Sequence, residues 1–282
     1  MSEAGAGERA AAVARLAAFG AGVDAEIDLA EAALLLASFD RPEASLEDCR
    51  ARLAAIVADL ETAAADASES LAGRTAVLRA VIAGRHGFTG DSETYDDLQN
   101  ANLISVIERR RGLPVALAII YIHVAGRLDW PVEGLNFPGR FLIRLGAGDG
   151  RAILDPFDGG AVRDAAALRE LLKIGAGPKA ELTPEHFTAV GNRGILLRLQ
   201  NNIRIRLMHV QALEQAAAVL ERMLLIAPKE PLLWLDAGGH YARLGNLRAA
   251  INAAEQCLRF AGEEGLRSRA QRLLQELKGK LN

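Results

Sequence analysis

The chain has 282 residues, of which 50% are hydrophobic and 24% charged, so it can bury at least one full core and form roughly two domains. Its net charge of −3 offers no excess of cations to phosphates or anionic lipids, which argues against nucleic-acid and membrane-surface binding. Abundant alanine and leucine, with only 5% aromatic residues, favour a mostly helical protein.

The two cysteines, Cys49 and Cys257, form no CxxC motif and no Cys/His cluster, so we predict neither a metal site nor a disulfide. Each lies on an apolar helical stripe and is expected to be a small core residue. Residues 1–22 contain charges but no continuous apolar region, so we expect a flexible tail there and no signal peptide. A reducing cytoplasm is the simplest location.

The first elements are expected to be helices separated by short loops. Asp28 is a plausible N-cap for a helix over 28–38, and Ser45 opens the next helix as part of a capping-box pattern. Further helices are expected over 75–83 and 100–110. Arg109, Arg110 and Arg111 form a small cationic patch, which either complements the end of the latter helix in solvent or anchors an anion or carboxylate.

The segment from 112 to 160 predicts a buried helix followed by a small antiparallel sheet. Pro114 suits the first turn of a helix that is apolar nearly all round, although too short to span a membrane. His123 is its lone polar interruption, either a hydrogen-bonded core residue or a catalyst without an evident partner. The predicted strands cover 132–135, 141–145 and 151–155, with a turn at Pro138-Gly139 and the loop GAGDG between the last two strands.

Two registers of this last hairpin fit the sequence. One places Arg140 opposite Asp155, and the other places Phe141 there. They pair Leu145 with Gly150 or with Arg151, respectively.

The C-terminal third shows a repeat of roughly 34 residues that is typical of tetratricopeptide repeats. A short helix over 165–172, a Gly/Pro linker and a helix start at Thr183 precede it. We expect repeat units over 197–230 and 231–264, then a capping helix over 266–277. The second unit carries the signature residues Pro231, Trp234, Gly238, Tyr241, Gly245 and Ala250, and the first has Ala216 and Pro228.

The order Gly112-x-Pro114-x-x-x-Ala118, then NFPGRFLIR at 136–144 and ILDPFDGG at 153–160, resembles the transglutaminase-like superfamily. It resembles more narrowly the bacterial SirB-type branch, in which tetratricopeptide-like helices follow that core. The resemblance implies an α+β, mostly helical fold: a papain-like core with a small antiparallel sheet, then a helical repeat segment. We expect the core domain over 23–190 and the repeats over 191–282.

The resemblance also implies a degenerate active centre. Active members have a Cys at the start of the buried helix, a His on one strand and an Asp on the next, and the matching positions here hold Pro114, Arg140 and Asp155. Proline offers no nucleophile, and a guanidinium cannot serve as a general base. SirB-type relatives often carry Ser two positions after the proline and His after the Pro-Gly turn, where this chain has Ala116 and Arg140. We hypothesise that Arg140 and Asp155 form a charge-assisted clamp or the wall of an anion pocket; alternatively, Arg140 points into water.

Three functions therefore stay open. The chain is a non-catalytic protein-binding or regulatory scaffold, a residual hydrolase or acyltransferase that uses Ser105 or Tyr121, or a sensor of a small anion. We expect no cofactor, no nucleic-acid partner and no membrane partner. The candidate ligand residues are Arg140, Arg144, Asp155, Asn100 and Asn102. The candidates for a peptide groove are Arg198, Asn201, Ile205, Met208, His209, Leu235, Gly239, Ala242 and Arg243.

Overall fold

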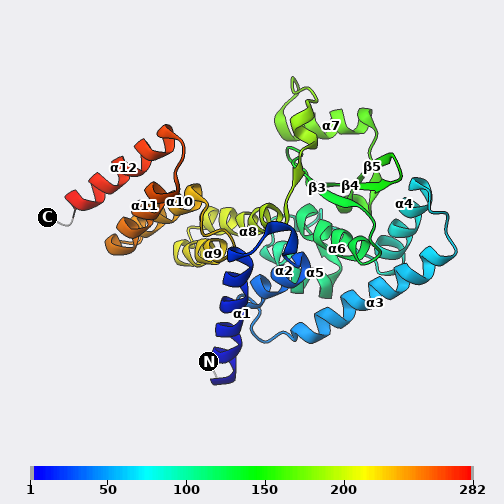
Figure 1. Cartoon of the computed structure of the whole chain (residues 1–282), viewed down its shortest axis with the longest axis horizontal. Coiled ribbons are helices and arrows are strands. Elements are labelled where there is room, and N and C mark those ends of the chain that lie inside the picture. Colours follow the sequence, from blue (N-terminus) through cyan, green and yellow to red (C-terminus); the bar gives the residue numbers. More distant parts are fainter. Residues whose placement is uncertain (1–2, 281–282) are drawn as a thin grey trace. The chain divides into compact units, whose positions relative to one another are not determined.

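The computed structural model describes residues 3–280, and side chains from residue 5 onward. The chain forms two compact units, one over residues 27–199 and the other made of 1–26 together with 200–282. Helices dominate both units (Figure 1). Short 3-10 helices cover Asp24–Glu26, Leu98–Ala101, Pro156–Asp158 and Pro184–Phe187.

The 27–199 unit begins with three helices, of which the first two start at the predicted caps and the third starts earlier than the expected 75–83. The carboxylate of Asp28 accepts a 3.0 Å hydrogen bond from the Glu31 backbone N–H at the start of α2 (Leu29–Ser38). The hydroxyl of Ser45 caps α3 (Leu46–Ala65) in the same way, at 3.1 Å from the Asp48 N–H. Helix α4 (Leu71–Arg79) continues into a π-helical stretch, Ala80–Arg85.

Two further helices form the buried centre of this unit. Helix α5 (Leu103–Arg109) is followed by α6 (Pro114–Gly126), in which ten residues, from Pro114 to Ala125, are buried. A short parallel pair, β1 (Thr89–Gly90) with β2 (Arg111–Gly112), leads into α6. The N–H of Leu113 donates to the carbonyl of Asn100 at 2.8 Å, which fixes the start of α6. The predicted buried helix is confirmed.

The antiparallel sheet has the strand order β6-β5-β4-β3-β7. Its strands are β3 (Val132–Leu135), β4 (Leu142–Ala147), β5 (Gly150–Asp155), β6 (Ala161–Val162) and β7 (Ala189–Val190). Helix α7 (Ala165–Ala176) covers one face, where Leu168 and Leu172 pack against Leu135 and Leu142. Helix α6 packs against β3 and β4 from the other side (Figure 1).

Both registers expected for the β4–β5 hairpin are wrong. Leu145 pairs with Ala152, and the ladder continues to Ala147 and Gly150. The strands therefore extend into the predicted loop and leave only Gly148 and Asp149 to connect them. Gly148 has a φ of +53°, which the tight connection requires and which glycine adopts without steric cost.

The other unit contains α1 (Glu3–Ala21) and the helices that follow Gln200. The expected flexible tail is wrong for residues 3–21, because this alanine-rich segment has high helix propensity and packs against α9. Leu16 of this helix is fully buried and Ala12 is 5% exposed. The expectation for residues 1–2 lies outside the described residues.

The repeat helices follow the predicted order, with antiparallel neighbours. They are α8 (Asn192–His209), α9 (Leu213–Ile226), α10 (Pro231–Arg243), α11 (Leu247–Phe260) and α12 (Glu264–Gly279). The indole N–H of Trp234 donates to the carbonyl of Pro228 at 2.8 Å, and the Tyr241 hydroxyl donates to Glu221 at 2.9 Å. Trp234 thus ties α10 to the loop that precedes it, and Tyr241 ties α10 to α9. Cys49 and Cys257 have free thiols and are buried, as expected of small core residues.

Candidate functional site

Asp155, the last residue of β5, is a fully buried carboxylate. Its Oδ1 accepts a 3.1 Å hydrogen bond from the backbone N–H of Phe157, and its Oδ2 accepts one of 2.9 Å from Nη2 of Arg163. A buried carboxylate is costly unless it is paired and hydrogen-bonded, and these contacts meet that requirement. Asp155 is therefore held in place on both oxygens.

Arg140 lies in the turn before β4 and approaches Asp155 without a hydrogen bond. Its Nε is 3.7 Å from Oδ2 of Asp155, within ion-pair range, and its guanidinium lies 4.5 Å from the centre of the Phe157 ring. With 24% of its side chain exposed, Arg140 does not simply extend into water. The proposed pair thus has the geometry of an ion pair stacked on an aromatic ring.

Arg163 is the partner of Asp155 that sequence reasoning missed. It follows β6, and its Nη2 also donates to Asp158 at 2.7 Å. Burial would lower the pKa of Arg163, but the hydrogen bond and charge of Asp155, with those of Asp158, outweigh it and raise the pKa. The available signal was the Gly159-Gly160 turn, which brings β6 back alongside β5.

In the described part of the chain, none of the candidate positions Pro114, Tyr121 and Ser105 supplies an activated nucleophile beside this carboxylate. Pro114, which holds the expected position of the nucleophile in the sequence resemblance, begins α6. The Tyr121 hydroxyl on α6 is buried without a hydrogen-bond partner in the described chain. Burial raises the pKa of Tyr121, Arg79 opposes this, and the charge of Asp155 adds to it, so the phenol stays neutral. The hydroxyl of Ser105 accepts a 3.0 Å hydrogen bond from Arg41, a cation that cannot take its proton.

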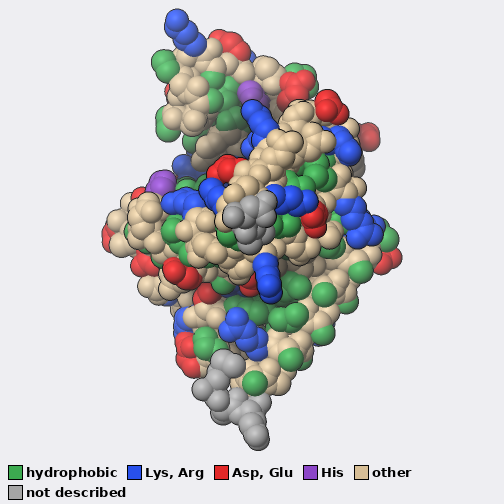
Figure 2. Space-filling view, turned by 90° about the vertical axis from the view of Figure 1, so that its left-hand side faces the viewer, with side chains coloured by type: hydrophobic (Ala, Val, Ile, Leu, Met, Phe, Trp, Pro, Cys, Tyr) green, Lys and Arg blue, Asp and Glu red, His purple; other side chains and the backbone are tan. Residues whose placement is uncertain are grey.

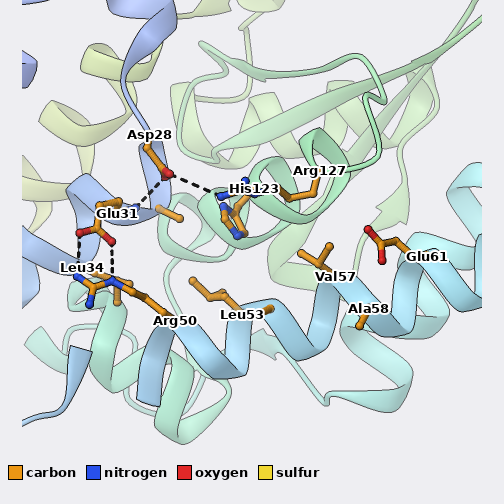
Figure 3. A pocket seen from close by; sticks show the side chains of 12 residues that line it. Asp28, Glu31, Leu34, Arg50, Leu53, Val57, Ala58, Glu61, His123 and Arg127 are labelled. Atoms are coloured by element: carbon orange, nitrogen blue, oxygen red, sulfur yellow. Dashed lines mark hydrogen bonds and ion pairs between the residues drawn. The ribbon is translucent and has the colours of Figure 1, made fainter. Parts of the chain in front are cut away.

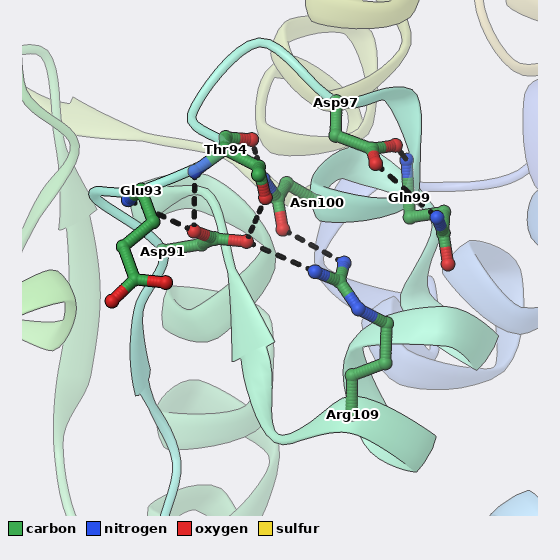
Figure 4. Close-up of polar contacts among 7 residues, drawn as sticks. All are labelled: Asp91, Glu93, Thr94, Asp97, Gln99, Asn100 and Arg109. Carbon is green, nitrogen blue, oxygen red and sulfur yellow. Dashed lines mark hydrogen bonds and ion pairs between the residues drawn. The ribbon is translucent and has the colours of Figure 1, made fainter.

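A second polar cluster surrounds Asp91, before the start of α6 (Figure 4). Its carboxylate accepts hydrogen bonds from the Thr94 N–H at 2.8 Å, the Thr94 hydroxyl at 2.6 Å and Arg109 at 2.9 Å. Thr94 holds the pKa of Asp91 well below its usual range; burial opposes this, and Arg109 and Asn100 reinforce it. Arg109, one residue of the predicted cationic patch, thus contacts a carboxylate inside the fold.

Asn100 and Asn102, offered as ligand residues, are used inside the fold. Asn100 accepts a 3.0 Å hydrogen bond from Arg109 and donates to the Thr94 carbonyl at 2.6 Å. Asn102 caps α5 by accepting from the Ser105 N–H at 3.1 Å, and donates to the Ala37 carbonyl at 3.0 Å. Both side chains are buried. Their polar atoms stabilise loops and caps.

Arg144 does not join Arg140 at Asp155. It pairs across β3–β4 with Glu133, with Nε at 2.9 Å, and donates to the Phe187 carbonyl at 3.2 Å. The two arginines proposed for anion sensing therefore have separate partners.

A cavity of about 460 Å³ lies between α2, α3 and α6 (Figure 3). Leu34, Leu53 and Val57 contribute apolar wall, while Arg50 makes hydrogen bonds of 2.9 and 2.8 Å to Glu31. The half-buried side chain of His123 also lines this cavity. Burial and the charge of Arg127 lower the pKa of its imidazole, whereas the charge of Asp28 acts to raise that pKa. Asp155 is not among its lining residues.

The candidates for a peptide groove are distributed over both units. Arg198 donates to the Phe137 carbonyl at 3.2 Å and stacks 5.2 Å from the Phe141 ring, so it belongs to the 27–199 unit and is not part of a repeat groove. A hollow of about 480 Å³ does lie on the repeat helices. Of the groove candidates, Leu235, Gly239 and Arg243 line it, whereas Asn201, Ile205, Met208, His209 and Ala242 do not.

Helices α8 and α12 supply lining residues that sequence reasoning missed. They are Arg204, Arg269, Arg272, Leu273 and Glu276. Figure 2, viewed from the side on which α11 and α12 lie in Figure 1, shows Lys and Arg side chains interspersed with acidic ones on the near face. Within residues 3–280 no group of three or more His, Cys, Asp or Glu side chains could hold a metal ion. No helix in that range is long and apolar enough to cross a bilayer.

Comparison with known families assigns the core. The family model described as "Transglutaminase-like superfamily" matches residues 47–201, the region that contains α6, the sheet and Asp155. The chain belongs to the transglutaminase-like superfamily. A tetratricopeptide-repeat model matches residues 203–275 of this superfamily member, which covers α9 to α11 and most of α12. The fold inferred from the sequence resemblance is confirmed.

Bacterial relatives of this transglutaminase-like protein support the narrower SirB-type assignment. It is 31% identical to a UPF0162 protein of Vibrio cholerae over 80% of this chain and 83% of the relative. It is 30% identical to Protein SirB1 of Salmonella typhimurium, over 64% and 68%. A UPF0162 protein of Xylella fastidiosa is 35% identical over 62% of this chain, which spans 63% of that relative's length.

Proposed function

We propose that this protein is a non-catalytic member of its superfamily that binds a protein partner as a scaffold or regulator. The supporting observation is the state of Asp155, whose carboxylate accepts a hydrogen bond from Arg163, forms an ion pair with Arg140 and, within residues 3–280, contacts neither a thiol nor an imidazole. The superfamily chemistry needs a thiolate that attacks and a base that takes and returns a proton. Pro114 and Arg140 can do neither.

The repeat helices support the binding role. Tetratricopeptide repeats commonly mediate protein interactions, and the repeat model matches residues 203–275. In this proposal the core, with Asp155 as an internal clamp, is a rigid support. The two buried free thiols, Cys49 and Cys257, fit the cytoplasmic location that we propose.

An assay of amide chemistry tests the non-catalytic half of the proposal. Purified protein is incubated with casein and a fluorescent primary amine to detect transfer, and with a peptide amide to detect hydrolysis. We expect rates equal to the buffer blank. A rate above the blank that disappears in Asp155→Ala, while Arg151→Ala retains it, would overturn the proposal.

In-cell cross-linking tests the binding half. A photo-reactive group placed on the exposed surface of α10 or α12 should yield a discrete adduct, and the same group on the exposed face of α3 should not. Adducts from α3 alone would assign partner binding to the core and contradict the role of the repeats.

The other two functions receive less support from the contacts. A hydrolase with Tyr121 as nucleophile would need its proton removed, whereas burial raises the pKa of that phenol. Ser105 already accepts a hydrogen bond from Arg41. An anion sensed through Arg140 and Arg144 would have to displace Asp155 and Glu133 from their ion pairs.

A further inference from the structure

The hollow on the repeat helices lies among α8, α10 and α12, within the 200–282 part of the chain. Its walls combine an apolar strip of Leu235, Gly239 and Leu273 with an unusual share of arginines. The full lining is Arg204, Leu235, Asp236, Gly239, His240, Arg243, Arg269, Arg272, Leu273 and Glu276. We refer to these residues as the arginine groove.

The charges of the arginine groove do not balance. The carboxylate of Asp236 is 3.4 Å from Arg204, and that of Glu276 accepts a 2.6 Å hydrogen bond from Lys280. Both acidic residues of the lining are thereby compensated. Arg243, Arg269 and Arg272 are exposed and have no carboxylate partner in the described part of the chain. Three positive charges thus converge on one hollow of a chain whose net charge is −3.

A buried polar atom without a partner lies in the same lining. His240 is 7% exposed, and its Nδ1 has no hydrogen-bond partner within the described residues. Buried polar groups usually have such a partner, and an exception inside a lined hollow points to a missing one. This observation is independent of the arginines.

We propose that the arginine groove binds an acidic segment of a partner protein. Asp or Glu side chains of that segment pair with Arg243, Arg269 and Arg272, since a guanidinium binds a carboxylate through two parallel hydrogen bonds. An apolar side chain of the segment covers Leu235 and Leu273. This inference rests on the proposed function and specifies the chemistry of its partner.

Other anionic occupants fit the groove less well. Its lining holds no Phe, Tyr or Trp on which a nucleic-acid base could stack, and the chain as a whole carries negative charge. A second copy presenting the same face would bring like charges together, which disfavours that contact. An acidic peptide brings both the carboxylates and the apolar group that the lining matches.

Fluorescence anisotropy with the full chain tests the proposal. The probe is a short labelled peptide rich in Glu with interspersed Leu, and its counterpart has Gln at every Glu position. The test variant carries Arg269→Gln and Arg272→Gln on α12. The control carries Arg248→Gln and Arg259→Gln, which remove the same charge from exposed positions of α11 outside the groove.

We expect the Glu peptide to bind, with an affinity that falls as salt rises, and the Gln peptide to bind at least about tenfold more weakly. The α12 variant should lose about tenfold in affinity and the α11 control less than about twofold. Circular dichroism checks that both variants fold.

Several outcomes would overturn the proposal: no binding of the Glu peptide, equal binding of the Gln peptide, or equal losses in both variants. Displacement of the peptide by a single-stranded oligonucleotide at lower concentration would instead assign a nucleic acid. Concentration-dependent dimerisation abolished by the α12 variant would assign a second copy. If a partner identified by cross-linking binds the α12 variant as tightly as the wild type, the proposed function stands and only the arginine groove is refuted.

Discussion

Nη2 of Arg163 donates a 2.9 Å hydrogen bond to Asp155, whereas Nε of Arg140 lies 3.7 Å from the same carboxylate oxygen. The buried carboxylate therefore has its closer charged contact with Arg163, and the more distant one with Arg140, which the sequence resemblance places at the expected histidine position. This difference can be measured as stability.

We expect Arg163→Met to lower the free energy of unfolding by roughly 2–4 kcal/mol, because it removes a charged hydrogen-bond donor from the buried carboxylate of Asp155. Arg140→Met should cost less than about 1 kcal/mol, since it removes a longer, partly screened contact. Urea titration of both variants provides the measurement. Equal losses would show that the two arginines share the carboxylate evenly.

Asp91→Asn should reduce stability, by about 1–3 kcal/mol at neutral pH, because Arg109 loses a charged acceptor. The pKa of Asp91 lies below its ordinary value of 3.8 in the folded protein. Its contribution is therefore full above pH 3.8 and is lost as the pH falls through the lowered folded-state pKa. Urea titrations at pH 7 and about pH 3 should show the gap between wild type and variant narrowing in acid. A gap that widens in acid would contradict the assignment.

His123→Gln should make stability less sensitive to mild acid. Burial lowers the pKa of His123 below its ordinary 6.5, so below that pH the unfolded chain binds more protons than the folded one. The wild type should thus lose stability as the pH falls from 6.5 towards the folded-state pKa, and the variant should lose less. The readout is the difference between the two proteins in urea midpoint at about pH 7.5 and 5. Parallel pH profiles would exclude a role for this imidazole.

Gly160→Ala tests the turn that returns β6 to Asp155. Gly160 has a φ of +73°, and an added Cβ would lie 2.9 Å from the Tyr121 hydroxyl. Gly148→Ala is the control, because its φ is +53° but its Cβ would meet nothing within 4 Å. We expect the control to cost about 1 kcal/mol of backbone strain and Gly160→Ala at least about 1 kcal/mol more. Equal melting temperatures of the Gly160→Ala and Gly148→Ala variants would show that the Tyr121 ring moves aside freely.

Much of the fold could be predicted from local patterns. Pro114 and the apolar run after it predict α6, and Val132–Leu135 has its predicted bounds. The repeat signature around Trp234 and Tyr241 predicts α10 and α11. In these segments periodicity and turn chemistry agree with the tertiary structure.

The rest depends on contacts between distant segments. The register of the hairpin depends on how far the two strands extend into the GAGDG segment. Composition alone does not distinguish a two-residue connection from a longer glycine-rich loop. Arg163 reaches Asp155 only because the chain reverses at Gly159-Gly160. The arginine groove requires α12 beside α10, which the repeat pattern of α10 and α11 does not include.

The sheet ends on each side in a strand of only two residues, β6 and β7. Such short borders offer few unpaired backbone groups for another chain to extend, a device by which natural proteins resist amyloid-like stacking. A chain added at either of these two strands could pair with only two residues there, so recruitment by strand addition onto β6 or β7 is disfavoured.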